Sequence, residues 1–228
     1  GENRWHKDTE WPPKCAVEKN LYLSSGDGAS ADGGGALTFD RPVAAGEDHY
    51  VYDPDDPTPF LIDVSENECL VPENYKDVEL RDDVLVYTTE PLKEAVTIAG
   101  EPVAILYAAS SAKDTDWVVR ITDLDQAGNS IRMCDGIVRA KFRKSFIEPK
   151  LLLPGEIVRY EIPMTWISNR FEVGHRIRVE VASGADNSIF CNTNTGFPIV
   201  DDVDKVVAEQ TVYSGGDHCS RVILPIIE

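Results

Sequence analysis

Alternation of apolar and polar residues with a period of two is the feature that most limits what this chain can fold into. It recurs in three runs along the chain, each with one apolar set and one largely polar set. A period of two places successive side chains on opposite faces of a strand, whereas a helix needs apolar residues spaced three and four apart. We therefore predict strands with one face in a core and one in water. The apolar sets are Trp117, Val119 and Ile121; Val158, Tyr160, Ile162 and Met164; and Ile177, Val179 and Val181.

More short apolar runs, bounded by turn sequences, predict further strands. Strands that recur about every dozen residues without helical patterns between them favour two packed antiparallel sheets over a parallel α/β sheet. We predict one all-β sandwich domain over residues 1–228, with irregular tracts at Ser24 to Gly35 and Tyr52 to Glu79. The runs are Val84 to Thr88, Ala95 to Ala99, Val103 to Ala109, Gly136 to Phe142 and Arg221 to Ile226.

The charge of the chain excludes two classes of partner. Lys and Arg total 22 against 40 Asp and Glu, which gives a formal net charge of −18. Such a chain repels phosphate backbones and anionic lipid surfaces, so we predict no nucleic-acid partner and no membrane partner. The longest uncharged apolar stretch, Pro102 to Ala112, is about half the length that a bilayer crossing needs.

The cysteines and the first residue bear on the origin of the chain. Its five cysteines are an odd number and show neither a Cys-x-x-Cys pair nor zinc-like spacing to a histidine. We predict reduced thiols and a cytoplasmic location. The first residue is Gly1 rather than Met, and we interpret the chain as a piece of a longer protein.

Motifs of common catalytic and cofactor sites are missing from the sequence. No serine lies in Gly-x-Ser-x-Gly, and His-Glu-x-x-His, Gly-x-Gly-x-x-Gly and the phosphate-binding Gly-x-x-x-x-Gly-Lys are all absent. The acidic runs at 53–56 and 201–204 contain oxygen ligands of the kind that calcium prefers, but neither reproduces an EF-hand loop, so we favour solvated loops. We predict no catalytic residue, no metal and no cofactor.

A pair of aspartates precedes one of the predicted strands. Asp114 and Asp116 flank Thr115 just before Trp117. Carboxylates in this position either cap backbone amides or pair with arginines. We predict that at least one of them forms such a structural contact with the arginines Arg139, Arg143, Arg176 and Arg178 or with backbone amides.

Several short motifs, in order along the whole chain, carry a resemblance to a known family. They are Trp5…Trp11-Pro12, Tyr22-Leu23, Tyr52-Asp53-Pro54-Asp55-Asp56-Pro57, Arg81 to Tyr87, Asp114-Thr115-Asp116-Trp117, Asp135 to Arg139, Pro154-Gly155-Glu156, Gly174 to Arg178, Asn192 to Gly196 and Leu224 to Ile227. The chain resembles the C-terminal domain of the X-Pro dipeptidyl-peptidase and cocaine esterase family of serine hydrolases.

The resemblance implies an architecture and a role. It implies a jelly-roll β-sandwich similar to galactose-binding modules, cut from a longer hydrolase whose Ser, Asp and His lie upstream of Gly1. The chain would then be a non-catalytic accessory domain that packs on its own catalytic α/β-hydrolase domain and helps to shape the active-site pocket. The substrate of the parent would be a small ester or an X-Pro peptide.

The resemblance also suggests residues for the pocket and the domain seam. The stretch after the Tyr-Asp-Pro motif is near substrate in that family, and it corresponds here to Phe60, Leu61 and Ile62; the family's usual Gly-Gly is replaced by Phe60-Leu61, and packing beneath the loop or against the missing domain is the alternative. We place Trp5, Trp11 and Pro12 on the inter-domain seam, and the apolar face there favours a homodimer.

A second function stays open from the sequence. Jelly-roll folds commonly hold sugars on loops or on an exposed aromatic face, so a free-standing carbohydrate-binding module is the alternative. The tryptophans lie mostly in family-like motifs or apolar alternation, which favours core packing or docking.

Overall fold

Strands form nearly all of the regular structure in the computed structural model, which describes residues 1–2, 4–26, 28–61, 73–198 and 203–228. Within these residues two 3-10 helices accompany the strands, η1 (Val78–Leu80) and η2 (Ala140–Phe142). The strands are β1 (Ala16–Ser24), β2 (Gly35–Thr38), β3 (Gly46–Tyr52), β4 (Leu85–Thr88), β5 (Val96–Gly100), β6 (Val103–Ser110), β7 (Asp116–Leu124), β8 (Ser130–Arg139), β9 (Val158–Pro163), β10 (Ile167–Phe171), β11 (Arg176–Ala182), β12 (Ala208–Ser214) and β13 (Arg221–Ile227). No helix in this part of the chain is long and apolar enough to cross a membrane.

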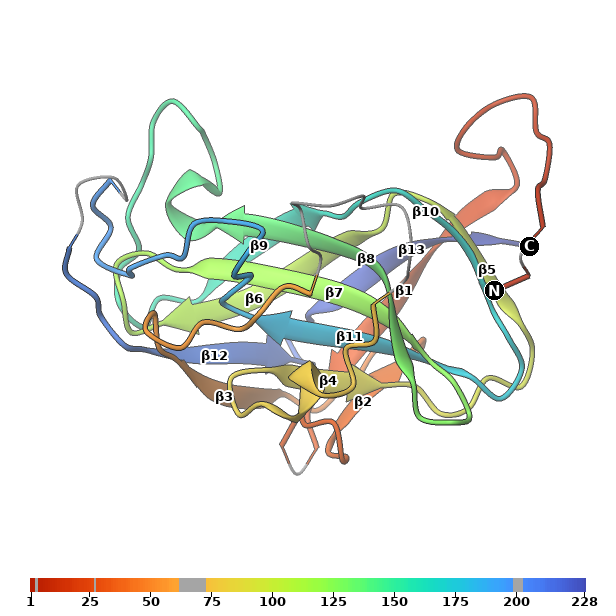
Figure 1. Ribbon diagram of the computed structural model, residues 1–228, viewed down its shortest axis with the longest axis horizontal. Coiled ribbons are helices and arrows are strands. Elements are labelled where there is room, and N and C mark those ends of the chain that lie inside the picture. Colours follow the sequence, from red (N-terminus) through yellow and green to blue (C-terminus); the bar gives the residue numbers. More distant parts are fainter. Residues whose placement is uncertain (3, 27, 62–72, 199–202) are drawn as a thin grey trace.

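The strands are hydrogen-bonded into one continuous mixed sheet that folds over to make a sandwich (Figure 1). The order along the main path is β3-β12-β6-β13-β1-β2-β4-β11-β7-β8, with β9 on β6 and β5 joining β10 to β13. All of these pairs are antiparallel except β2 with β4. The predicted all-β sandwich is confirmed, but the layers are continuous through β1, β2 and β4 rather than two separate antiparallel sheets.

The main core lies between the two layers. Trp117 on β7 is fully buried and meets Tyr50 of β3 edge-on at 6.5 Å and Tyr160 of β9 at 5.7 Å, measured between ring centroids. Leu21 and Leu224 belong to the same buried cluster. Aromatic and aliphatic side chains from both layers therefore supply the hydrophobic free energy that holds the sandwich together.

Gly136 lets β8 and β9 approach closely at the edge of the sandwich. A Cβ at this position would lie 2.5 Å from the carbonyl oxygen of Pro163. No real side chain tolerates that distance, so the contact between these strands depends on a residue without a Cβ.

The expected wet face is present on β9, but the prediction is wrong for β7 and β11. Buried residues alternate with exposed or partly exposed ones along β9, whereas Asp116 to Asp123 of β7 and Ile177 to Ala182 of β11 are buried on both faces. The parts of the β3–β4 connection (residues 53–84) that the structure describes, 53–61 and 73–84, cover the second face. They place Phe60 against Val118 and Tyr75 against Ala182. The connection thus adds a third, partial layer to the sandwich.

Candidate functional site

The described residues contain no arrangement that resembles a hydrolase active site. No group of three or more His, Cys, Asp or Glu side chains among them is placed to hold a metal ion. His175 Nδ1 lies 2.8 Å from Asp123 Oδ1, and the His218 ring lies between Tyr107 and Tyr213. Neither imidazole is hydrogen-bonded to a hydroxyl in this part of the chain, so neither has a nucleophile to activate.

One histidine does contact both a hydroxyl and a carboxylate. His49 Nδ1 is 3.1 Å from Thr211 Oγ1, and its Nε2 is 3.3 Å from Glu47 Oε1. These side chains belong to β3 and its partner β12 and project into solvent, where the imidazole is 61% exposed. Because His49 and Thr211 face each other across paired strands and the imidazole is exposed, we interpret the contacts as cross-strand pairing on a wet face.

The predicted aspartate pair forms a buried polar cluster at the entry of β7. Arg139 donates Nε and Nη2 to the two carboxylate oxygens of Asp116 at 2.8 and 2.7 Å. Asp114 accepts the backbone N–H of Lys141 at 2.9 Å and lies 3.3 Å from Lys141 Nζ. The amide of Asn192 donates to both carboxylates, at 3.2 Å to Asp114 and 2.9 Å to Asp116. The cluster ties the start of β7 to the end of β8 and to the loop after β11.

Burial raises the pKa of Asp116, although the Arg139 guanidinium and the Asn192 amide favour its charged form. Arg139 is 18% exposed at its side chain, whereas Asp116 is 1% exposed. Because the carboxylate is held away from water, its charge depends on the bidentate guanidinium contact.

We expect Asp116→Ala to lower the free energy of unfolding by about 3 kcal/mol, because Arg139 and Asn192 lose their acceptor in a buried site. In a chain of this size that loss corresponds to a fall of roughly 6 to 12 °C in melting temperature. Differential scanning calorimetry of the 228-residue chain measures it. The exposed Asp40 provides the control: Asp40→Ala should leave the melting temperature nearly unchanged, and equal curves for both variants would contradict the structural role.

The other three predicted arginines have different partners. Arg143 donates to the carbonyl oxygens of Ala140 and Lys150, and Arg176 to that of Thr89. Arg178 pairs with Glu79 of η1. Of the four predicted arginines, Arg139 is therefore the one that contacts the aspartate pair, while Arg176 and Arg178 lie on β11 and bind the segment after β4 and the β3–β4 connection.

Phe60, which the resemblance suggested for the substrate pocket, is buried. It is 4% exposed, and its ring lies 5.4 Å from the guanidinium carbon of Arg120 and 5.1 Å from that of Arg132. Leu61 is 40% exposed and donates its backbone N–H to Tyr75 Oη at 3.0 Å. Ile62 lies outside the described residues. The burial of Phe60 agrees with the alternative of packing beneath the loop, and the pocket role of these residues stays a prediction.

Sequence reasoning missed a buried ionic network beneath the same connection. Arg120 on β7 donates to Glu180 on β11 at 2.6 Å, and both side chains are 1% exposed. The Arg120 guanidinium also stacks on the Tyr75 ring, 3.8 Å from its centroid. Tyr75 comes from the connection, so the network fastens this segment to the outer face of the sheet. The sequence does contain a signal for this network, namely charged residues at alternate positions of β7 and β11. The same pattern is typical of a strand face exposed to solvent, so it does not by itself predict burial.

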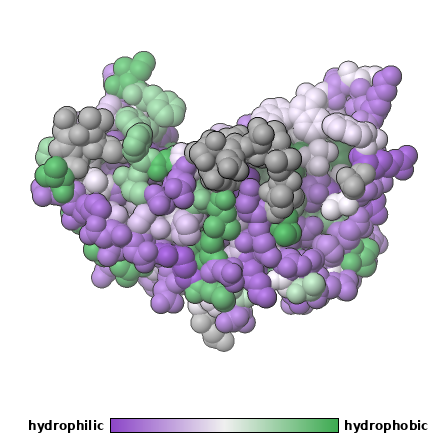
Figure 2. Space-filling view, in the orientation of Figure 1, coloured by the Kyte–Doolittle hydropathy of each residue, from purple (hydrophilic) through white to green (hydrophobic). Residues whose placement is uncertain are grey.

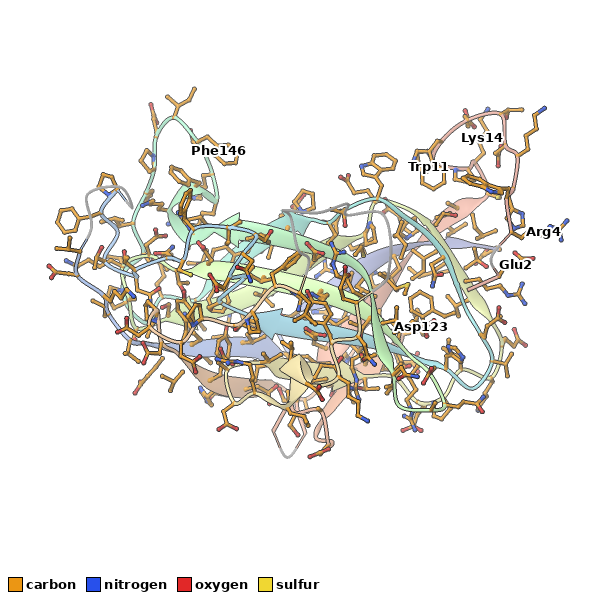
Figure 3. The ribbon with its side chains drawn as sticks, in the orientation of Figure 1. Glu2, Arg4, Trp11, Lys14, Asp123 and Phe146 are labelled. Carbon is orange, nitrogen blue, oxygen red and sulfur yellow. The ribbon has the colours of Figure 1, made fainter. Side chains whose placement is uncertain are left out.

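The predicted seam residues lie on an arm at the N-terminal end. Trp5 is 98% exposed, and Trp11 packs its ring 6.0 Å from that of Trp166. Pro12 follows Trp11 through a cis peptide bond and is also exposed. Figure 3 shows Trp11 at one end of the molecule, on the side where Phe146 stands at the other end. The structure thus places the three seam residues on a protruding arm whose other residues are mostly charged or polar.

Comparisons with known proteins agree on one family. The model of the X-Pro dipeptidyl-peptidase C-terminal non-catalytic domain matches residues 1–223. Cocaine esterase of Rhodococcus sp. (strain MB1 Bresler) is 36% identical over 233 residues, which cover 100% of this chain and 41% of the relative. A putative serine esterase of Mycobacterium bovis is 28% identical over 251 residues, covering 100% of this chain and 36% of that relative.

Solved structures give the same result. An aminopeptidase from a marine sediment Thaumarchaeota archaeon superimposes with a TM-score of 0.88 at 31% identity, covering 100% of this chain and 39% of the other. An α-amino acid ester hydrolase does so with a TM-score of 0.86 at 31% identity, covering 99% and 40%. This chain therefore belongs to the X-Pro dipeptidyl-peptidase and cocaine esterase family and represents its C-terminal non-catalytic domain.

Proposed function

We infer that residues 1–228 are the accessory domain of a longer serine hydrolase, packing on its catalytic domain and helping to shape the active-site pocket. The observation that carries this proposal is the family match over nearly the whole chain, combined with relatives of which the chain spans only 36–41%. The remaining length of such relatives has room for a catalytic domain with Ser, Asp and His.

The surface of the domain supports the packing role. Trp5, Trp11 and Trp166 are each at least half exposed on the N-terminal arm and beside it. Large apolar side chains gathered in this way mark interaction sites. A contact here would bury them at the side from which the chain enters the domain.

The substrate proposed for the whole protein is a small ester or an X-Pro peptide. Similar proteins carry the names cocaine esterase, α-amino acid ester hydrolase and aminopeptidase. Acyl transfer to a serine with histidine as general base covers these substrates. Leu61, exposed and held by Tyr75, is the residue of the predicted pocket segment that remains able to line such a pocket.

We expect the 228-residue chain to release no product from a p-nitrophenyl ester or an X-Pro anilide, because its described residues contain no activated nucleophile. The full-length hydrolase should turn over at least one of them, and deleting residues 1–228 should abolish that turnover or the stability of the enzyme. Activity of the 228-residue chain that a serine-directed inhibitor abolishes would contradict the accessory role. So would a deletion variant with unchanged kinetics and melting temperature.

A further inference from the structure

Two loops at one end of the sandwich present large apolar side chains to solvent. Phe146 and Ile147, at the tip of the β8–β9 connection, are 86% and 91% exposed, and Phe190, on the loop after β11, is 82% exposed. Figure 2 shows apolar side chains raised at this end above a mostly hydrophilic surface. Contiguous exposure of such residues is typical of a binding surface.

The tip of the β8–β9 connection is held in shape by its own hydrogen bonds. Lys150 donates its backbone N–H to the carbonyl of Lys141 at 2.8 Å, and Arg143 Nη1 donates to the Lys150 carbonyl at 2.5 Å. Ser145 Oγ accepts the backbone N–H groups of Ile147 and Glu148, both at 3.1 Å. A loop that is ordered before binding loses little conformational entropy on contact, which favours association.

A hollow continues the apolar surface from the tip towards Phe190. It measures about 370 Å³ and is lined by Asp116, Ile137, Arg139, Phe142, Ser188, Ile189 and Phe190. Phe142 also stacks on Phe146 with ring centroids 5.7 Å apart, so tip and hollow form one surface. At the hollow's polar side, Arg139 uses Nε and Nη2 for Asp116 and Phe190, while Nη1 has no partner among the described residues. The hollow thus suits an apolar side chain next to an oxygen acceptor.

The position of this surface indicates what covers it. In Figures 1 and 2 the β8–β9 connection and the N-terminal arm rise on the same side of the molecule, at its two ends, and Figure 3 labels Phe146 and Trp11 there. A body attached through the N-terminal arm therefore faces both raised ends. Relatives of which this chain spans 36–41% contain enough further chain to form such a body.

We propose that the Phe146–Ile147 tip and the adjoining hollow are a second contact surface for the catalytic domain, opposite the tryptophans of the arm. The inference rests on the proposed function and adds the place of contact. The tip inserts between side chains of the catalytic domain, and the hollow receives an apolar side chain whose neighbouring carbonyl accepts from Arg139 Nη1. The accessory domain then contacts the catalytic domain at both ends of this side, rather than through the N-terminal arm alone.

Limited proteolysis of the full-length hydrolase tests this inference. Cleavage between two domains follows the population in which they have separated, when separation is fast relative to cleavage. Removing two buried apolar side chains from the contact should raise that population, so Phe146→Ser combined with Ile147→Ser should speed inter-domain cleavage by roughly 10- to 100-fold. Phe190→Ser should act in the same direction. In the 228-residue chain these variants should melt as the parent chain does, because the side chains are exposed there.

A matched control variant and the deletion of residues 1–228 distinguish a failure of the proposed contact surface from a failure of the proposed accessory function. Val43 is 92% exposed on the β2–β3 connection, outside the proposed surface, and Val43→Ser should leave cleavage unchanged. If deleting residues 1–228 destroys activity or stability but the tip variant is cleaved at the Val43→Ser rate, the contact surface is wrong and the accessory function stands. If the deletion changes nothing, the accessory function itself fails. Loss of a dimer on gel filtration, or loss of binding on a glycan array, without faster cleavage would assign the surface to a second copy or to a sugar and overturn the inference.

Discussion

Replacing Arg120 with alanine is expected to lower the free energy of unfolding by about 3–5 kcal/mol. Glu180 would remain fully buried without its 2.6 Å partner, and Tyr75 would lose the guanidinium stacked on its ring. Removing one member of a buried ion pair leaves Glu180 either as an uncompensated charge or as a carboxyl group that must take up a proton, and this costs far more than the pair contributes when intact. Urea unfolding of the 228-residue chain, followed by tryptophan fluorescence, measures the loss.

Two further variants make this prediction specific. Arg159, on the exposed side of β9, pairs with Glu161 at 3.0 Å while 45% exposed, so Arg159→Ala should cost less than about 1 kcal/mol. Replacing both members of the buried pair, Arg120→Met with Glu180→Leu, should recover most of the stability, because apolar side chains of similar volume need no partner. A double variant as unstable as Arg120→Ala would show that the pair does not act through its charges.

The sequence predicted β4 to β9, β11 and β13, and it missed β1, β2, β3, β10 and β12. In the predicted strands, the inward residues are mainly apolar. β7, β9 and β11 have this pattern, and so does β6. β3 was missed because its inward set is polar and aromatic, and β12 was missed because Gln210 and Ser214 interrupt an inward set that also contains Ala208 and Val212. On β3, the inward Asp48 accepts hydrogen bonds from Ser25, from the Ala29 backbone and from Tyr87. On β12, the inward Gln210 is fully buried. Hydrophobic periodicity does not detect a strand whose buried positions are satisfied by hydrogen bonds from distant segments.

Contacts in the candidate site were predictable only where both residues lie close together in the sequence or belong to a recognisable motif. Asp116 and Arg139 lie on adjacent strands of one hairpin, in register with each other, and the sequence indicated that such a contact would form. The burial of Arg120 and Glu180 depends on Tyr75, which comes from an irregular connection with no periodic signal. Phe60 comes from the same connection, so its burial against Val118 had no periodic signal either. The apolar and polar pattern of β7 and β11 does not reveal that another segment covers their polar face.

We expect the burial of Glu180 to make the free energy of unfolding depend on pH. Burial raises the pKa of Glu180 to about 7 from its usual 4.5, with the neighbouring Glu79 adding to the effect and Arg120 opposing it. Because the folded chain then holds a proton that the unfolded chain releases, Glu180 favours folding below about pH 4.5, and this contribution is lost as the pH rises towards 7. The difference between the two pKa values corresponds to about 3 kcal/mol.

Glu180→Gln mimics the protonated side chain at every pH, so the free energy of unfolding of the parent chain minus that of the variant should fall by up to about 3 kcal/mol between pH 4.5 and 7.5. Titrating groups that do not interact with Glu180 cancel in this difference, so the change reports Glu180 together with its neighbour Glu79. Urea unfolding at half-unit pH steps provides the data. Glu161, 61% exposed on β9, supplies the control, since the same subtraction for Glu161→Gln should be nearly flat. A flat difference for Glu180→Gln as well would mean that the carboxylate stays charged across this range, held by Arg120 strongly enough to offset its burial.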